Sequence, residues 1–251
     1  MAHTEETHTG VAHTEVAHTE VTHTEVANTE VANTEVAAAA SENGIDALIL
    51  DIDGTLWDST GIVSVAWERA AEETGFSGMK IPPETLKGLF GKTMDDIAYA
   101  LVPDADPEKR KELIGRCVEY EQEALENDPC HICYPGVIDT IRELGRRMKI
   151  AIVSNCQSGY IELFMAKTGL TDMEICDKEC FGDTGKGKAE NIASVVARNG
   201  FSHALYVGDT EGDRIAAYEA GTGFIAADYG FGEPGASDYR IDSFDRLCDL
   251  F

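Results

Sequence analysis

Short apolar runs alternate with segments of helical periodicity from residue 135 to the end of the chain. The apolar runs predict strands at 149–153, 173–176, 204–207 and 224–226, and the periodic segments predict helices at 135–147, 158–168, 188–199, 213–220 and 241–251. Strands joined through helices pair in parallel, because each helix carries the chain back to the end of the sheet at which the previous strand began. With an earlier apolar run at 47–50, this alternation predicts an α/β fold with a doubly wound parallel sheet.

The segment 60–128, after the first predicted strand, has a helical pattern almost throughout. Helices are predicted at 60–74, from Pro82, at 94–101 and at 106–127, and no strand is convincing. We therefore expect an inserted α-helical domain at 60–128, while 43–59 and 129–251 form the α/β core. A cleft between two such domains is the natural place for a ligand.

The first forty residues repeat the pentapeptide Val-Ala-His-Thr-Glu, later Val-Ala-Asn-Thr-Glu. This period fits neither a helix nor a strand, and Val and Ala bury too little surface to offset the entropy of ordering. Residues 1–42 are accordingly expected to form a disordered low-complexity arm. Its histidines leave a metal-binding tail as the alternative: His3, His8, His13, His18 and His23.

The chain has a net charge of −26, and residues 41–251 keep −19 of it because the first forty residues contribute −7. This acidity argues against nucleic acid, which is bound through its phosphates, and against anionic membrane surfaces. No apolar run approaches the roughly 18 residues that span a bilayer. No secretion signal is recognisable either, so we expect a cytoplasmic protein. We expect it to be a monomer or a homodimer.

Seven cysteines in a chain of 251 residues favour reduced thiols over a disulfide framework. The pairs Cys130/Cys133 and Cys176/Cys180 offer four thiols, so a structural zinc site is the alternative. The wide separation of the two pairs in the sequence favours reduced thiols.

Two aspartates, Asp51 and Asp53, directly follow the apolar run 47–50, and Gly54 and Thr55 then turn the chain away from the strand. Side chains alternate along a strand, so the two carboxylates can share one side. Carboxylates held close repel each other unless a cation or a shared proton lies between them. The strand end therefore predicts a divalent metal or one protonated acid, with a plain turn as the alternative. A calcium loop is excluded, because its further oxygens and closing Glu are missing.

Two later predicted strands also end in polar residues: Ser154 and Asn155 follow one, and Asp209 follows another. Function in an open parallel sheet gathers at the carboxyl ends of the strands, so these residues are expected beside Asp51. Carboxylate oxygens of Asp51 and Asp209 suit Mg²⁺. Asp213, about one helical turn after Asp209, is placed to ligate the ion or to brace Asp209.

This set of residues points to phosphoryl transfer. Ser154, Asn155 and a lysine of the pair Lys186 and Lys188 are donors suited to phosphate oxygens. Asp51 is the expected nucleophile, which forms an aspartyl-phosphate, and Asp53 would protonate the leaving oxygen and then activate water. Taken singly, the motifs have structural alternatives: a helix cap at Ser-Asn, a loop at Gly-Asp and a solvated pair of lysines.

In this order the motifs resemble those of the haloacid dehalogenase superfamily, in its phosphatase and phosphomutase branch. They are Asp51-Ile52-Asp53-Gly54-Thr55, then Ser154-Asn155, then a lysine before a helix, then Gly208-Asp209-Thr210-Glu211-Gly212-Asp213. The resemblance covers about 45–251. It implies a Rossmann-like core, phosphate binding near Gly54 and Thr55, and Mg²⁺ held by Asp51, the Asp53 backbone carbonyl and Asp209. Lys188 is the preferred third motif because it opens its helix directly, although Lys186 also fits.

The segment 60–128 resembles the small cap of phosphoglycolate phosphatases and β-phosphoglucomutases. Within it, 88–93 looks like a substrate-specificity loop, in which Lys92 either contacts a second anionic group or is a surface lysine. The resemblance implies a Mg²⁺-dependent phosphatase that acts on a small phosphorylated metabolite through an aspartyl-phosphate, as phosphoglycolate phosphatases do. A phosphomutase is the alternative enzyme, and Asp53 argues against dehalogenation. A non-catalytic binding module is the alternative from another class, against which the intact set of aspartates argues.

Overall fold

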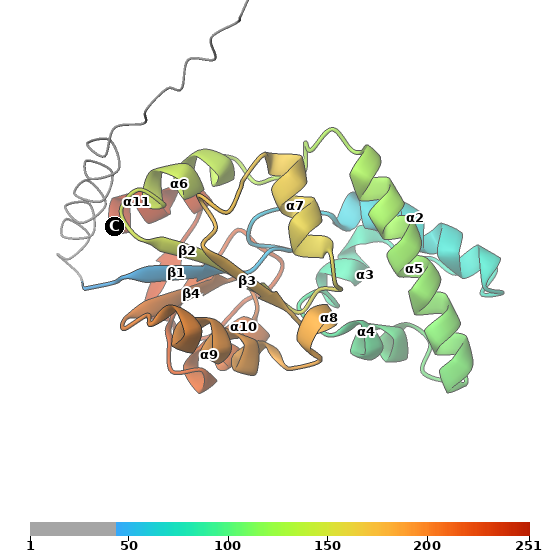
Figure 1. The fold of residues 1–251 in the computed structure, drawn as a ribbon. Helices are drawn as coiled ribbons and strands as arrows, with labels where there is room; N and C mark the ends of the chain where they lie inside the picture. Colours follow the sequence, from blue (N-terminus) through green and yellow to red (C-terminus); the bar gives the residue numbers. More distant parts are fainter. Residues whose placement is uncertain (1–43) are drawn as a thin grey trace, which may run out of the picture. The chain divides into compact units, whose positions relative to one another are not determined.

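A computed structural model describes residues 44–251 (Figure 1). Within this range six strands form one sheet in the order β3-β2-β1-β4-β5-β6, and all neighbours are parallel. The strands are β1 Ala47–Leu50, β2 Lys149–Ser154, β3 Asp177–Cys180, β4 Ala204–Gly208, β5 Gly223–Ala227 and β6 Tyr239–Ile241. The predicted fold class is confirmed. The predicted arm of residues 1–42, with its five histidines, lies outside the described residues.

The first strand lies inside the sheet, with β2 on one side and β4 on the other. The chain therefore winds outward from β1 in both directions, to β3 at one edge and to β6 at the other. In an open parallel sheet, ligands bind where the strand order reverses, beyond the carboxyl ends of the strands. Asp51 leaves β1 at this point, and its N–H donates to the Val207 carbonyl of β4 at 3.0 Å.

Both faces of the sheet are covered by helices. Leu48 and Leu50 of β1 join a core with α6 (Val137–Leu144), α7 (Tyr160–Thr168) and α11 (Leu247–Leu250). Ala47 and Ile49 join a second core with α9 (Lys188–Asn199) and α10 (Glu211–Glu219). Figure 1 shows α9 and α10 on the opposite side of the sheet from α6 and α11. Because β1 is buried on both faces, its sequence is an unbroken apolar run and not an alternation.

The helical segment, residues 60–128, contains α2 Thr60–Glu73, α3 Pro83–Lys87, α4 Met94–Leu101 and α5 Pro107–Asn127. Its helices share a hydrophobic cluster of their own, in which Trp67, Leu113 and Cys117 are fully buried. The helices α2, α4 and α5 begin and end within one residue of their predicted bounds. Among the helices described, none, α5 included, combines the length and apolar composition of a membrane span. The division of the chain into a core and an inserted domain stays a prediction.

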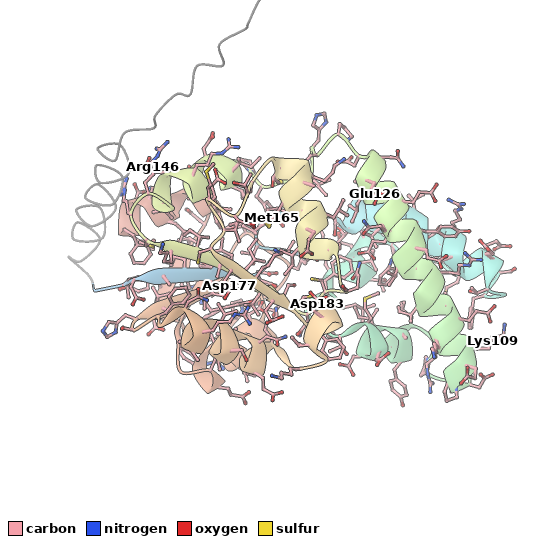
Figure 2. All side chains as sticks on the ribbon, viewed as in Figure 1. Lys109, Glu126, Arg146, Met165, Asp177 and Asp183 are labelled. Carbon is pink, nitrogen blue, oxygen red and sulfur yellow. The ribbon has the colours of Figure 1, made fainter. Side chains whose placement is uncertain are left out.

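The strand predicted at 173–176 is wrong, because β3 occupies Asp177–Cys180 and Met173 is exposed. This strand lies at an edge of the sheet, where Asp177 is labelled in Figure 2. Its charged residues form ion pairs with α9: Arg198 lies 2.6 Å from Asp177 and 2.5 Å from Glu179. An edge strand with such partners accommodates charged side chains, so its apolar signal is weak.

The helix predicted at 241–251 is also wrong in its first half. Tyr239–Ile241 forms β6, and a 3₁₀ turn at Phe244–Arg246 and the short α11 follow it. Ile241 is held in the strand by its pairing with Ala227 and by the Asp228 N–H, which donates to its carbonyl at 2.9 Å. One further short helix, α8 Phe181–Thr184, is too short to leave a periodic pattern and was not predicted.

All seven cysteines lie among the described residues and are free thiols. The sulfur atoms of Cys130 and Cys133 are 3.8 Å apart, whereas the Cys180 thiol donates to the Asp183 carboxylate at 3.1 Å. Within residues 44–251, no cluster of three or more potential metal ligands includes a cysteine. The alternative of a zinc site shared by the two cysteine pairs therefore finds no support in the described part of the chain.

Candidate active site

The carboxyl ends of three adjacent strands bring buried polar side chains together. Asp51 follows β1, Ser154 ends β2 and Asp209 follows β4, and all three are at most 5% exposed. The register pairs Leu50 with Ile152 and with Val207, so the three strands end within two residues of one another. Asp51, Asp209 and Asp213 each offer a carboxylate oxygen, and these atoms lie within 4.8 Å of one another.

A buried lysine joins two of these aspartates. The Lys188 ammonium lies 2.5 Å from Asp213 Oδ1 and 3.0 Å from Asp51 Oδ1. The contact with Asp51 is an ion pair between two buried groups. Burial disfavours the charge on Lys188, but Asp213 and Asp51 outweigh it and raise the lysine pKa. Burial raises the pKa of Asp51 to about 6, an effect that Lys188 opposes.

Asp209 and Asp213 are held by different partners. The Thr55 hydroxyl donates to Asp209 Oδ1 at 3.1 Å, and the Phe231 N–H donates to Oδ2 at 2.8 Å. Asp213 Oδ2 accepts from the N–H and hydroxyl of Thr210 at 3.0 and 2.7 Å, in the capping box that begins α10. Both oxygens of Asp213 are therefore engaged, one by Lys188 and one by Thr210, which fits its expected bracing role.

The turn after β1 depends on a glycine. Gly54 has a φ of +83°, and a Cβ there would lie 2.2 Å from Asp209 Oδ2. The N–H groups of Gly54 and Thr55 donate to the carbonyls of Trp57 and Ile52 at 2.9 and 3.1 Å. The two residues expected to bind phosphate therefore have their N–H groups engaged inside the turn. What they provide in this structure is the close approach of the turn to Asp209.

We expect Gly54→Ala to destabilise the protein by more than the ~1–3 kcal/mol that positive-φ strain costs a residue with a side chain. The reason is that the added methyl group must also displace the Asp209 carboxylate. Urea unfolding of both proteins measures the difference. Gly75→Ala is the matched control, because Gly75 has a φ of +93° and open space around it. Equal losses in the two variants would contradict the close contact with Asp209.

Asp53 is held through one of its two oxygens. Oδ1 accepts from Trp57 Nε1 at 3.0 Å, from the Ser59 hydroxyl at 2.7 Å and from the Tyr160 hydroxyl at 2.9 Å. Burial raises the pKa of Asp53 to about 7, although these donors oppose the shift. Because three donors already crowd Oδ1, a proton on this acid belongs on Oδ2. Asp53 is thus a carboxylic acid that keeps a proton close to neutral pH, fixed in one orientation.

The donor set fits a divalent cation. Asp51, Asp209 and Asp213 place three carboxyl groups in a buried space, and Lys188 pairs with two of them, Asp51 and Asp213. Burial, Asp213 and Asp51 raise the pKa of Asp209 well above its usual range, as expected for carboxyl groups buried close together. A divalent ion would balance the remaining charge, and hard oxygen ligands are those that Mg²⁺ prefers.

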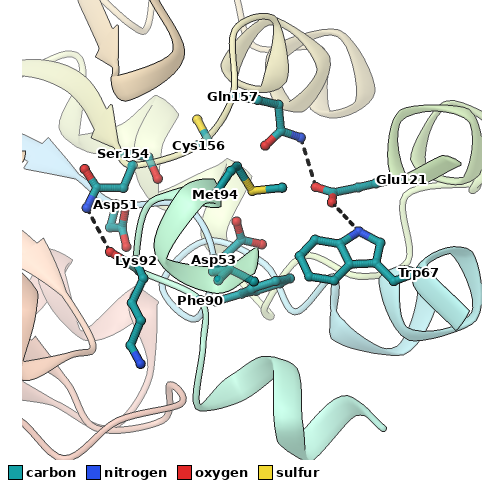
Figure 3. A pocket seen from close by; sticks show the side chains of 13 residues that line it. Asp51, Asp53, Trp67, Phe90, Lys92, Met94, Glu121, Ser154, Cys156 and Gln157 are labelled. Carbon is teal, nitrogen blue, oxygen red and sulfur yellow. Dashed lines mark hydrogen bonds between the residues drawn. The ribbon is translucent and has the colours of Figure 1, made fainter. Parts of the chain in front are cut away.

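A pocket opens from Asp51 and Asp53 toward the helical segment (Figure 3). Its walls come from the core, from the loop between α3 and α4, and from α2, α4 and α5: Trp67, Phe90, Gly91, Lys92, Met94, Ile97, Glu121, Ser154, Asn155, Cys156 and Gln157. Two hydrogen bonds cross the pocket from core to helical segment. Asn155 Nδ2 donates to the Gly91 carbonyl at 2.8 Å, and Gln157 Nε2 donates to Glu121 Oε1 at 3.0 Å.

The two lysines of the third motif differ in position. Lys188 is buried among the carboxylates, whereas the Lys186 side chain is exposed and no contact joins it to them. Lys92 lines the pocket, but its side chain is exposed and extends away from Asp51 and Asp53 (Figure 3). Asn155 uses its amide nitrogen on Gly91, while its oxygen is buried without a hydrogen bond.

Sequence reasoning missed the residues that hold Asp53 and those that close the pocket. Trp57, Ser59 and Tyr160 belong to no motif, and Tyr160 is far from Asp53 along the chain. Glu121 did leave a signal, because it stands four residues after Cys117 and four before Leu125 on the buried face of α5. A glutamate in an apolar stripe of a helix indicates either a buried partner or a ligand.

Comparisons with known proteins place the chain among hydrolases. The family of haloacid dehalogenase-like hydrolases matches residues 48–227. A phosphoglycolate phosphatase of Vibrio vulnificus is 26% identical over 232 residues, which cover 84% of this chain and 97% of that protein. A phosphoglycolate phosphatase of Rhodobacter capsulatus is 30% identical over 201 residues, which cover 74% of this chain and 85% of that protein. A haloacid dehalogenase-like hydrolase of Streptococcus pneumoniae shares the fold, with a TM-score of 0.70 at 19% identity over 82% of this chain and 98% of that one.

Proposed function

This chain belongs to the haloacid dehalogenase-like hydrolase family, in its phosphoglycolate phosphatase-like branch, and we propose that it is a Mg²⁺-dependent phosphatase. It hydrolyses a small phosphorylated metabolite through an aspartyl-phosphate on Asp51. The phosphatase class rests on the family and its curated relatives. The observation that carries the mechanism is the pairing of a buried carboxylate, Asp51, with an acid two residues later, Asp53, whose pKa is raised to about 7.

The reaction needs two proton transfers, and Asp53 is placed for both. The Asp51 carboxylate attacks phosphorus, the bond to the ester oxygen breaks, and the proton of Asp53 goes to that oxygen so that an alcohol leaves. Asp53, now ionised, takes a proton from water as the water oxygen attacks phosphorus. The bond between phosphorus and Asp51 then breaks, which releases phosphate and restores Asp51 as a carboxylate and Asp53 as an acid.

Five other polar side chains support this reaction. Lys188 holds the Asp51 carboxylate at 3.0 Å and offsets its charge. Ser154 and Asn155, at the end of β2, are donors for the phosphate oxygens. Asp51, Asp209 and the Asp53 backbone carbonyl would hold Mg²⁺, with Asp213 as their brace through Lys188. When bound, the ion offsets the negative charge that develops on the phosphoryl group.

The helical segment fits the role of a cap over the reacting groups. It has its own hydrophobic cluster and meets the core across the pocket through Asn155 and Gln157. Closure over a substrate would exclude bulk water from the aspartyl-phosphate until the alcohol has left.

The seven free thiols fit a reducing compartment, so we propose that the enzyme works in the cytoplasm.

We expect the purified protein to release phosphate from a metabolite panel only when Mg²⁺ is present. We expect the Asp209→Asn variant to need a half-saturating Mg²⁺ concentration about tenfold higher or more. The amide keeps the size of the side chain and loses the charge that binds the ion. A Mg²⁺ titration of phosphate release compares the two proteins, with Asp228→Asn as the control because Asp228 pairs with Arg240 at the surface. An unchanged titration would contradict the ligand role of Asp209. An isomerised product without free phosphate would instead identify a phosphomutase.

A further inference from the structure

Glu121 is a buried acid at the pocket that the proposed reaction does not use. It lies on α5 and is 3% exposed. Trp67 Nε1 donates to its Oε2 at 2.8 Å, and Gln157 Nε2 donates to its Oε1 at 3.0 Å. Figure 3 shows this chain of three side chains along the same pocket that Asp53 lines. The leaving group of a substrate bound at Asp51 would extend toward it.

The wall around Glu121 offers no cation for an acidic ligand. Besides the two catalytic aspartates, the charged side chains that line this pocket are Glu121 and Lys92, and the Lys92 side chain extends away from it. The other neighbours are apolar or neutral: Trp67, Phe90, Met94, Ile97 and Gln157. A carboxylate on the leaving group would therefore lie in a buried space beside a second carboxyl group, where the repulsion is weakly screened.

Glu121 still has capacity to accept hydrogen bonds. Each oxygen accepts one hydrogen bond, whereas an ionised carboxylate provides about four lone-pair sites. Burial raises the pKa of Glu121 to about 7. A cationic ligand would favour its ionised form, and an anionic ligand would force it to bind a proton. The apolar rings of Trp67 and Phe90 suit contact with a short hydrocarbon chain of such a ligand.

We propose that Glu121 is a specificity residue, which selects phosphate esters whose alcohol part carries an ammonium group and rejects those whose alcohol part carries a carboxylate. This inference rests on the proposed phosphatase function and deepens it. Phosphoglycolate carries a carboxylate beside its phosphate ester. The inference therefore predicts that this chain acts on a different substrate from the phosphoglycolate phosphatases to which it is similar.

Four esters of two-carbon alcohols test it with the full-length protein and Mg²⁺: 2-aminoethyl phosphate, 2-hydroxyethyl phosphate, ethyl phosphate and 2-phosphoglycolate. They differ in the group that would meet Glu121 and hardly in size. We expect kcat/KM for 2-aminoethyl phosphate to exceed that for 2-phosphoglycolate by about tenfold or more, because like charges placed together are strongly disfavoured. Equal values or the reverse order would overturn the inference while leaving the phosphatase function intact. No turnover of these esters or of an aryl phosphate would contradict the phosphatase function, and the inference with it.

Glu121→Gln assigns the preference to this residue. Glutamine keeps the size and can still accept from Trp67, but it carries no charge. We expect the kcat/KM ratio of 2-aminoethyl phosphate to 2-phosphoglycolate to fall by about tenfold, toward one. A structural role as a bridge between Trp67 and Gln157 would leave the ratio unchanged, and that result would overturn the assignment. The ranking of the four esters by the unaltered protein stands as a test even if the variant does not fold.

Lys92→Met addresses the competing possibility that Lys92 swings inward to bind an anionic group. In that case the variant would lose turnover of 2-phosphoglycolate selectively, and the ratio would rise. We expect the ratio to stay unchanged, because Lys92 is exposed and extends away from the pocket. A selective loss for 2-phosphoglycolate would assign specificity to Lys92 and overturn the role of Glu121.

Discussion

Asp51→Asn is expected to lower kcat by at least about 10⁴-fold, because an amide cannot form the acyl-phosphate bond and loss of a covalent nucleophile is rarely compensated. Rapid acid quench with a radiolabelled phosphate ester adds a direct measurement. Label should remain on the unaltered protein during turnover and be absent from the variant. Turnover of the variant within about tenfold of normal would show that another group attacks phosphorus.

The structure also predicts that this loss is not caused by unfolding. Burial raises the pKa of Asp51 to about 6, so ionisation of this carboxyl costs stability at every pH above its unfolded value of 3.8. Removing the charge therefore removes a cost, while Lys188 keeps its ion pair with Asp213 at 2.5 Å. Thermal unfolding at neutral pH should show Asp51→Asn to be as stable as the unaltered protein. Asp228→Asn, which touches only a surface ion pair, serves as the control for both measurements.

The fold could be predicted from the sequence because its strands and helices leave local sequence patterns. Ala47–Leu50 is buried on both faces, and such a strand must be apolar at every position. In the helical segment, α4 and α5 begin with polar N-caps, and α5 also has Pro at its first turn. The failures lie at the edges of the sheet. There β3 pairs its charged residues with Arg198, and β6 takes up residues whose pattern also suits a helix.

The residues of the candidate site could be predicted only where a sequence motif coincides with the end of a strand. Asp51, Ser154 and Asp209 meet because parallel strands place their carboxyl ends together. The sequence did not predict the three side chains that hold Asp53, which are Trp57, Ser59 and Tyr160. A side chain that orients an acid needs no fixed spacing from it along the chain. The choice between Lys186 and Lys188 also depended on tertiary packing, because two residues along the chain separate an exposed side chain from a buried one.

Asp53→Asn is expected to lower kcat/KM for alkyl phosphates by about 10²–10⁴-fold, the usual contribution of a general acid. The amide oxygen can accept the three hydrogen bonds from Trp57, Ser59 and Tyr160 that now reach Oδ1. The variant therefore keeps the orientation of the side chain and loses the proton that the leaving alkoxide needs. Since kcat/KM reports the steps up to departure of the alcohol, the loss should be much smaller for p-nitrophenyl phosphate, whose leaving group needs no proton.

The pH dependence of kcat/KM tests the same assignment with the sign fixed by the structure. Burial raises the pKa of Asp53 to about 7, and the acid must be protonated to act on the leaving oxygen. For alkyl phosphates kcat/KM should therefore fall as pH rises through about 7, and this limb should be absent from Asp53→Asn and weak for p-nitrophenyl phosphate. Asp58→Asn is the neighbouring control, because Asp58 lies outside the pocket and accepts from the Thr60 N–H at 3.0 Å, a bond that asparagine can keep. Equal losses for alkyl and aryl esters in Asp53→Asn would mean that Asp53 shapes the site without giving a proton, because only proton donation distinguishes the two leaving groups.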